Sequence, residues 1–95
     1  MSDLLSDERL TEALSGLNGW ERDGDAIARA AELESFPAAI EAVRRVAEIA
    51  EARDHHPDID IRWRTVTFRC WSHYAGGVTE HDVALAREIN GVLPG

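Results

Sequence analysis

The stretch from residue 36 to residue 54 constrains the fold more than any other part of the chain, because it keeps one periodicity over its whole length. Its apolar residues recur at three- and four-residue spacing, which is typical of one face of an α-helix: Phe36, Ile40, Val43, Val46, Ala47, Ile49 and Ala50. Ser35 precedes the stretch, and Pro37 falls in the first turn, where proline loses no hydrogen bond. Pro57 disfavours a helical conformation at His56. We therefore expect a helix that ends at about residue 54 and covers a sheet.

The segments before this helix predict a shorter helix and a hairpin. Ser6 is a suitable N-cap, and the apolar stripe that follows ends where Asn18-Gly19 stops the helix; the stripe consists of Leu10, Leu14 and Leu17. Strands are expected over Trp20–Arg22 and Ala26–Glu34, on either side of the turn-forming sequence Asp23-Gly24-Asp25.

The segments after the long helix predict a second hairpin and a last helix. Ile59–Trp63 and Thr65–Trp71 are expected to be strands, and the second alternates apolar with polar residues. Thr79 opens the last helix, whose inward side chains should be Val83, Ala86 and Ile89 or Asn90. This order favours an α+β fold of two layers, a four-stranded antiparallel sheet covered on one face by about three helices. We expect a single domain over residues 1–95, with Phe68 and Trp63 contributing to the core.

All four histidines lie within about a third of the chain, and three of them belong to one pattern. The sequence Glu51-x3-His55-His56-Pro57 is followed by His73 and Asp82. Histidine has an unperturbed pKa of roughly 6.5, so it can give or take a proton near neutral pH. Three such side chains together indicate acid/base chemistry on a small molecule, although three histidines can also bind zinc.

Composition narrows the partners and the compartment. The net charge is -8, from 18 acidic and 10 basic residues, and every basic residue is an arginine. This balance argues against nucleic acid, whose binding normally needs a basic surface. Cys70 is the only cysteine, so no intrachain disulfide can form and a reducing compartment fits best. No stretch approaches the roughly 20 apolar residues that cross a bilayer, and we expect a cytoplasmic protein that does not enter membranes.

The histidine pattern resembles the pterin-4a-carbinolamine dehydratase family. The resemblance is strongest over residues 50–89, where the pattern continues with an aromatic residue at Trp63, Ser72-His73 and Gly-x-Thr-x-x-Asp. It implies dehydration of a 4a-hydroxy-tetrahydropterin, which aromatic amino acid hydroxylases produce, to a quinonoid dihydropterin. Two histidines of different protonation would move the two protons, so no metal or bound cofactor is required. The implied partners are a pterin substrate, further copies of the chain in a homodimer or homotetramer, and a functional link to phenylalanine hydroxylase.

The resemblance also implies roles for individual residues. His55, His56 and His73 correspond to the active-site histidines, and we expect the last two to exchange protons with substrate while His55 polarises the hydroxyl group. Substrate-binding positions would be Glu51, Asp54, Pro57, Trp63, Ser72 and Asp82. The carboxylate of Asp54 suits the amino-pyrimidine edge of a pterin, because it accepts two donors.

Several of these residues also fit roles in local structure. Asp82 lies three residues after Thr79, so a capping box accounts for it without catalysis. Glu51 lies one turn before His55 and is expected on the same helical face, where its charge and the helix dipole would favour the imidazolium form. His81 lies outside the motif and is expected at the surface, and Cys70 should be a small buried apolar residue.

The chain departs from the family pattern in small ways. Ser72 stands where threonine is usual, Ile59 replaces an aromatic residue, and His81 stands where arginine occurs. Similar domains serve as dimerisation cofactors of a transcription factor or as assembly factors of another enzyme. A non-catalytic dimerisation, assembly or transcriptional coactivator module is therefore the alternative function, although such a module has no need of three proton-transfer groups.

Overall fold

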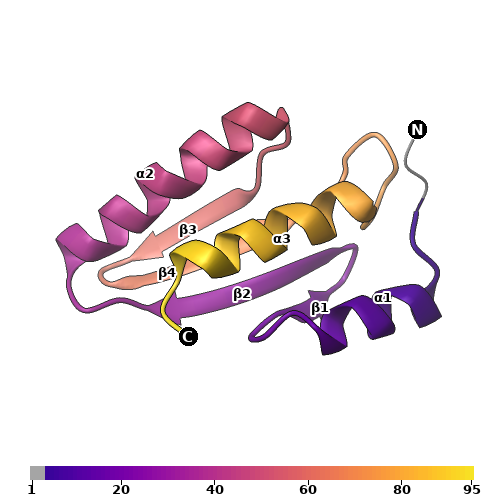
Figure 1. The fold of residues 1–95 in the computed structure, drawn as a ribbon, viewed down its shortest axis with the longest axis horizontal. Coiled ribbons are helices and arrows are strands. Elements are labelled where there is room, and N and C mark those ends of the chain that lie inside the picture. The colour runs from indigo at the N-terminus through magenta and orange to yellow at the C-terminus, as the bar shows by residue number, and fades with distance from the viewer. Residues whose placement is uncertain (1–3) are drawn as a thin grey trace.

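The computed structural model describes residues 4–95 and has the expected order of helices and strands (Figure 1). The elements are α1 (Asp7–Ser15), β1 (Glu21–Asp23), β2 (Ala26–Glu32), α2 (Phe36–Arg53), β3 (Asp58–Arg62), β4 (Thr65–Cys70) and α3 (Glu80–Val92). The α+β prediction, with a four-stranded antiparallel sheet, is confirmed. No helix within the described residues is both long enough and apolar enough to cross a membrane.

The sheet has the strand order β1-β2-β4-β3, so the two hairpins join through β2 and β4 at its centre. Ile27 lies opposite Cys70 and Ala31 opposite Val66, and these side chains point toward the layer of helices. Helices α2 and α3 lie side by side on the sheet, and α1 lies near β1 (Figure 1). Strand β3 is at an edge of the sheet, and all five of its residues are exposed.

One apolar core lies between the sheet and the helices. It takes residues from all three helices and from β2 and β4, including Leu10, Ile27, Val46, Phe68 and Ile89. Burial of this apolar surface is the main force that holds the two layers together. Four sequence predictions are confirmed here, namely the burial of Cys70 and Phe68, the inward positions of α3 and the packing of the first apolar stripe on the core. The first helix is shorter than predicted, because it ends at Ser15 and leaves Leu17 in the loop that follows.

Two predictions of buried residues are wrong. The buried face of α2 consists of Ala39, Ala42, Val46 and Ala50, whereas Phe36 and Ile40 are 48% and 42% exposed. Three of these four buried positions carry alanine, and the larger side chains of Phe36 and Ile40 lie outside the buried face. Trp63 is not a core residue: it is 70% exposed and has a φ of 55° in the turn between β3 and β4.

Candidate active site

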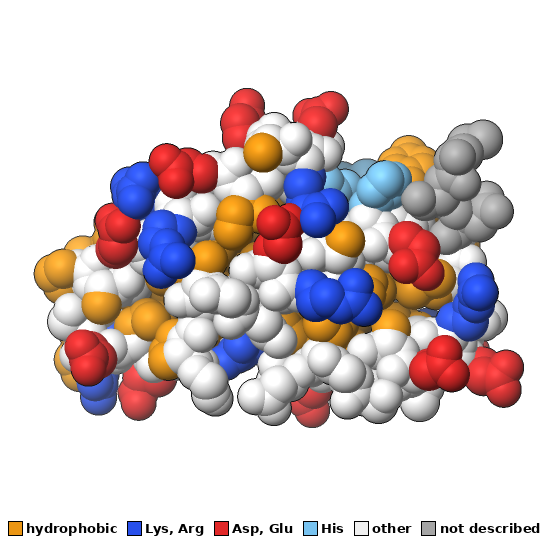
Figure 2. Space-filling view, viewed as in Figure 1, with side chains coloured by type: hydrophobic (Ala, Val, Ile, Leu, Met, Phe, Trp, Pro, Cys, Tyr) orange, Lys and Arg blue, Asp and Glu red, His pale blue; other side chains and the backbone are white. Residues whose placement is uncertain are grey.

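The capping residue at the end of α2, with the two residues that follow it, and the loop after β4 meet around a small cavity. Its volume is about 270 Å³, and it is lined by Asp54, His55, His56, Trp71, His73 and Tyr74. Figure 2 shows histidine side chains gathered at the surface where α2 ends and α3 begins. Three imidazole groups from two distant segments of the chain therefore line one cavity.

The end of α2 sends the two adjacent histidines in different directions. Asp54 caps the helix in the left-handed conformation, with a φ of 52°, and the His55 N–H donates to the carbonyl of Ala50 at 3.0 Å. This reversal brings His55 toward α3, where its side chain is only 15% exposed. The side chain of His56 remains 57% exposed, beside α2.

Asp82 is the centre of a buried network below the cavity. Its side chain is fully buried, and its Oδ2 accepts hydrogen bonds from the Thr79 N–H and the Ser72 hydroxyl, both at 2.8 Å. Its Oδ1 lies 2.6 Å from Nε2 of His55. Because an ionised carboxylate has only acceptor atoms, we assign the proton of this third bond to Nε2 of His55. Nδ1 of His55 is then the ring nitrogen that can contact a ligand.

The capping-box prediction for Asp82 is confirmed, and the network adds a second function to it. The same carboxylate caps α3, orients His55 and holds Ser72, the residue before His73. A substitution at Asp82 would therefore disturb two of the three histidines together.

Glu51 pairs with His56, and the expected contact with His55 is wrong. Its Oε1 lies 2.8 Å from Nε2 of His56, and both side chains are largely exposed. The reason is the left-handed cap at Asp54, which turns His55 away from the face of α2 that carries Glu51.

His73 lies on a tight turn that begins at Ser72. The carbonyl of Ser72 accepts the Gly76 N–H at 2.9 Å, and the Ser72 N–H donates to the carbonyl of Gly77 at 2.8 Å. The imidazole of His73 packs against Trp71, with ring centroids 4.0 Å apart. Trp71 and Tyr74 line the cavity and were not predicted from the sequence.

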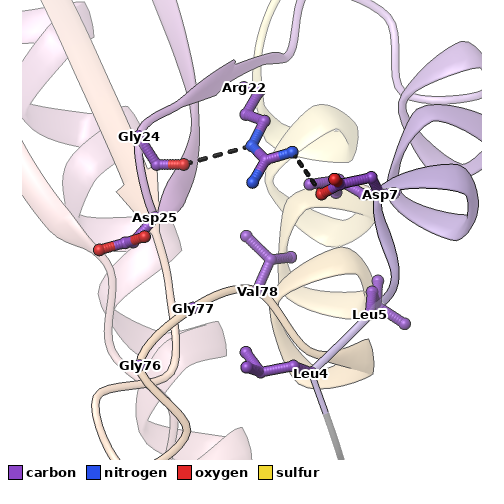
Figure 3. Close-up of a pocket in the computed structure, with 10 residues that line it drawn as sticks. Leu4, Leu5, Asp7, Arg22, Gly24, Asp25, Gly76, Gly77 and Val78 are labelled. Carbon is purple, nitrogen blue, oxygen red and sulfur yellow. Dashed lines mark hydrogen bonds and ion pairs between the residues drawn. The ribbon is translucent and has the colours of Figure 1, made fainter.

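The chain before α1 supports this turn from behind (Figure 3). The Leu5 N–H donates to the carbonyl of Val78 at 3.0 Å, and Leu4 packs so closely on Gly77 that a Cβ atom there would meet it at 2.8 Å. Leu4 and Leu5 line a separate cavity of about 190 Å³ between this segment and the loop that precedes α3. The turn that carries His73 is thus held by contacts on both sides.

The remaining predicted residues have different positions. Asp54 lines the cavity and Ser72 is buried beside Asp82, but neither Pro57 nor Trp63 is among the residues that line the cavity. His81 is exposed as expected, yet its ring centroid lies 5.7 Å from that of His55. Within residues 4–95, no three side chains of the metal-binding types are grouped as a metal ion would require.

Comparisons with known proteins show the family to which this chain belongs. A profile of the family described as "Pterin 4 alpha carbinolamine dehydratase" matches residues 3–92. A protein of Mycolicibacterium vanbaalenii, provisionally named a pterin-4-alpha-carbinolamine dehydratase, is 57% identical over 90 residues, which are 95% of this chain and 97% of the relative. A relative from Nocardia farcinica with the same provisional name is 58% identical over 89 residues, 94% of each chain.

A solved structure shares the fold. The crystal structure of a transcriptional coactivator/pterin dehydratase from Brucella melitensis superposes with a TM-score of 0.93 at 31% sequence identity. The alignment covers 97% of this chain and all of that one.

Proposed function

Because the chain belongs to the pterin-4-alpha-carbinolamine dehydratase family, we propose that it converts a 4a-hydroxy-tetrahydropterin to the quinonoid dihydropterin by histidine acid/base catalysis. The observation that carries the proposal is that His55, His56 and His73 line one cavity. The sequence motif alone does not require this convergence, since His73 comes from a different segment.

The reaction needs two proton transfers. An imidazolium protonates the 4a-hydroxyl group, which leaves as water, and a neutral imidazole accepts the proton of ring nitrogen 5 as the C=N bond forms. General acid/base catalysis of this kind typically contributes about 10²–10⁴-fold. One histidine loses a proton and another gains one, so the pair keeps its total number of protons. Exchange with solvent then restores the starting protonation state of each ring.

We assign the proton exchange to His56 and His73, and the contact with the departing hydroxyl group to His55. Support for this division comes from the surroundings of each ring. His55 is anchored through Nε2 to a buried carboxylate and offers one nitrogen to the ligand, whereas the other two rings are exposed to solvent, from which protons are exchanged. We assign the amino-pyrimidine edge of the pterin to Asp54, because its carboxylate can accept two hydrogen bonds and the residue lines the cavity.

The test is the decay of enzymatically generated 4a-hydroxy-tetrahydropterin, followed by stopped-flow absorbance. Wild type should accelerate the decay over buffer, and His73→Ala should lose about 10²-fold or more of that acceleration. His81→Ala is the matched control, because that histidine is exposed and does not line the cavity. Decay in the presence of wild type that is no faster than in buffer would exclude the dehydratase.

The oligomer, the cellular setting and the second role belong to the same proposal. We expect at least a homodimer through β3, because antiparallel self-pairing centred on Asp60 would bring exposed Ile59 of one copy against exposed Ile61 of the other. Light scattering should give a multiple of the 10.5 kDa chain mass, and Ile61→Lys should lower the measured mass.

The substrate implies a pterin-dependent hydroxylase, such as phenylalanine hydroxylase, in the same reducing cytoplasm.

The Brucella melitensis structure, described as both coactivator and dehydratase, supports a protein-binding module as the second candidate. A coactivator or assembly role without catalysis would leave pterin decay at the buffer rate. It would also be insensitive to His73→Ala.

A further inference from the structure

The three histidines of the cavity are held in place by different groups. His55 bonds to Asp82 and His56 bonds to Glu51, so each of these rings contacts a carboxylate. No hydrogen bond from the His73 side chain to another residue occurs within residues 4–95. The orientation of His73 must therefore come from packing.

The packing partner of His73 is Trp71. The two rings have centroids 4.0 Å apart and an interplanar angle of 36°. Aromatic rings in contact attract one another beyond the area that they bury. The turn at Ser72 brings the two side chains together, because its backbone is fixed by hydrogen bonds with Gly76 and Gly77.

Trp71 is itself fixed by a polar cluster on the uncovered face of the sheet. Its indole N–H donates to Oδ2 of Asp58 at 3.2 Å, and the guanidinium of Arg69 lies over its ring at 5.8 Å. Arg69 is in turn held by Asp23 at 3.1 Å and by Asp58 at 3.7 Å. The indole cannot rotate away from His73 without losing these contacts.

We propose that Trp71 is a positioning residue, which holds the imidazole of His73 in the orientation needed for proton exchange. The inference rests on the proposed dehydratase function. Asp58 and Arg69 act one step further away, since they fix the indole and do not line the cavity. An error of about 1 Å in the placement of a catalytic group can cost about 10²-fold in rate, so the ring behind His73 should matter for kcat.

Two substitutions at Trp71 separate its aromatic face from its N–H group. Trp71→Leu removes the ring, and kcat should fall about ten- to a hundredfold with KM little changed. Trp71→Phe keeps a ring against His73 and should recover most of that loss. Asp58→Ala keeps the ring but removes the acceptor of the indole N–H, so its loss of kcat should be similar to that of Trp71→Phe.

A spectroscopic measurement tests the same contact without using activity. In ¹H–¹³C NMR spectra, the ring protons of His73 should show an upfield ring-current shift that Trp71→Leu abolishes and Trp71→Phe partly keeps. Thermal melting of each variant identifies any that does not fold, in which case Asp58→Ala supplies the comparison.

A double-mutant cycle distinguishes positioning from a general structural role. If Trp71 acts through His73, then Trp71→Leu should have no further effect on kcat in a His73→Ala background. Equal losses in both backgrounds, or a rise in KM at unchanged kcat, would overturn the proposal. If wild type shows no dehydratase activity, the proposed function fails, whereas the NMR comparison still decides whether Trp71 orients His73.

Discussion

The site contains two carboxylate–histidine pairs, one for each of two adjacent histidines, and the pairs differ in burial and in the number of hydrogen bonds that they make. His55 and Asp82 are joined in a buried network, and the carboxylate has further bonds to Thr79 and Ser72. His56 and Glu51 form a single contact in solvent. The buried pair thus contributes to the stability of the fold, whereas the exposed pair only orients a side chain.

The difference follows from the cost of burying charge. A buried carboxylate is tolerated only when its oxygens accept enough hydrogen bonds, so every donor around Asp82 becomes necessary. Solvent can replace either partner of the exposed pair, which leaves little free energy at stake.

Asp82→Ala should have the largest effect on stability of the substitutions in the two pairs. The change removes the cap of α3 and leaves His55 and Ser72 without their acceptor, so we expect the free energy of unfolding to fall by about 3 kcal/mol or more. Urea denaturation followed by circular dichroism measures it. A loss below about 1 kcal/mol would mean that the network contributes little to stability.

Substitution of the two adjacent histidines should give a smaller contrast. His55→Ala leaves Oδ1 of buried Asp82 without its donor and should cost about 2 kcal/mol of stability as well as activity. His56→Ala should lower kcat with a change of stability within about 0.5 kcal/mol, because its partner is exposed. Urea denaturation and stopped-flow decay of the pterin, measured on the same preparations, would reveal equal stability losses if the comparison is wrong.

Much of the fold could be predicted from the sequence, because it depends on local periodicity and on turn residues. The helix of residues 36–53, both hairpins and the cap at Thr79 were predicted with ends within a few residues. The inward face of α2 was not, since the spacing of apolar residues does not show which of two neighbouring apolar stripes is buried, and the buried stripe includes Ala39 and Ala42.

The site was predictable only in part. The family motif identified the three histidines that line the cavity, but not the partners of His55 and His56. These partners depend on the left-handed turn at Asp54, a backbone conformation that the composition of the segment does not specify. Trp71 has no signal in the sequence, because an aromatic residue two positions before a histidine becomes its neighbour only when the chain turns.

Cys70 provides a test of burial on β4, close to the buried Asp82. Burial raises the pKa of its thiol well above the ordinary range, and the negative charges of Asp82 and Asp58 raise it further. The thiol ionises in the unfolded chain above its usual pKa of about 8.5 but stays protonated in the native state, so stability should fall as pH rises above that value, at up to about 1.4 kcal/mol per pH unit.

Few other side chains can titrate at this pH, because the chain has no lysine and a single tyrosine. Urea denaturation between pH 8 and pH 10 should show the slope in wild type and a reduced slope in Cys70→Ala. Native protein should also resist alkylation by iodoacetamide until urea unfolds it. Rapid alkylation of the native state would contradict the burial of the thiol.

Glu51→Gln should have the smallest effect on stability, because it changes only the exposed pair. The amide keeps a hydrogen-bonding group near His56 but removes the charge, so the free energy of unfolding should change by less than about 0.5 kcal/mol. Whatever difference remains at low ionic strength should vanish near 1 M salt, where the Debye length is about 3 Å. Asp82→Asn, measured beside it, should keep most of its destabilisation at high salt, because a buried pair is screened much less. A salt-independent loss in Glu51→Gln as large as that in Asp82→Asn would show that the pairs do not differ in the way their burial implies.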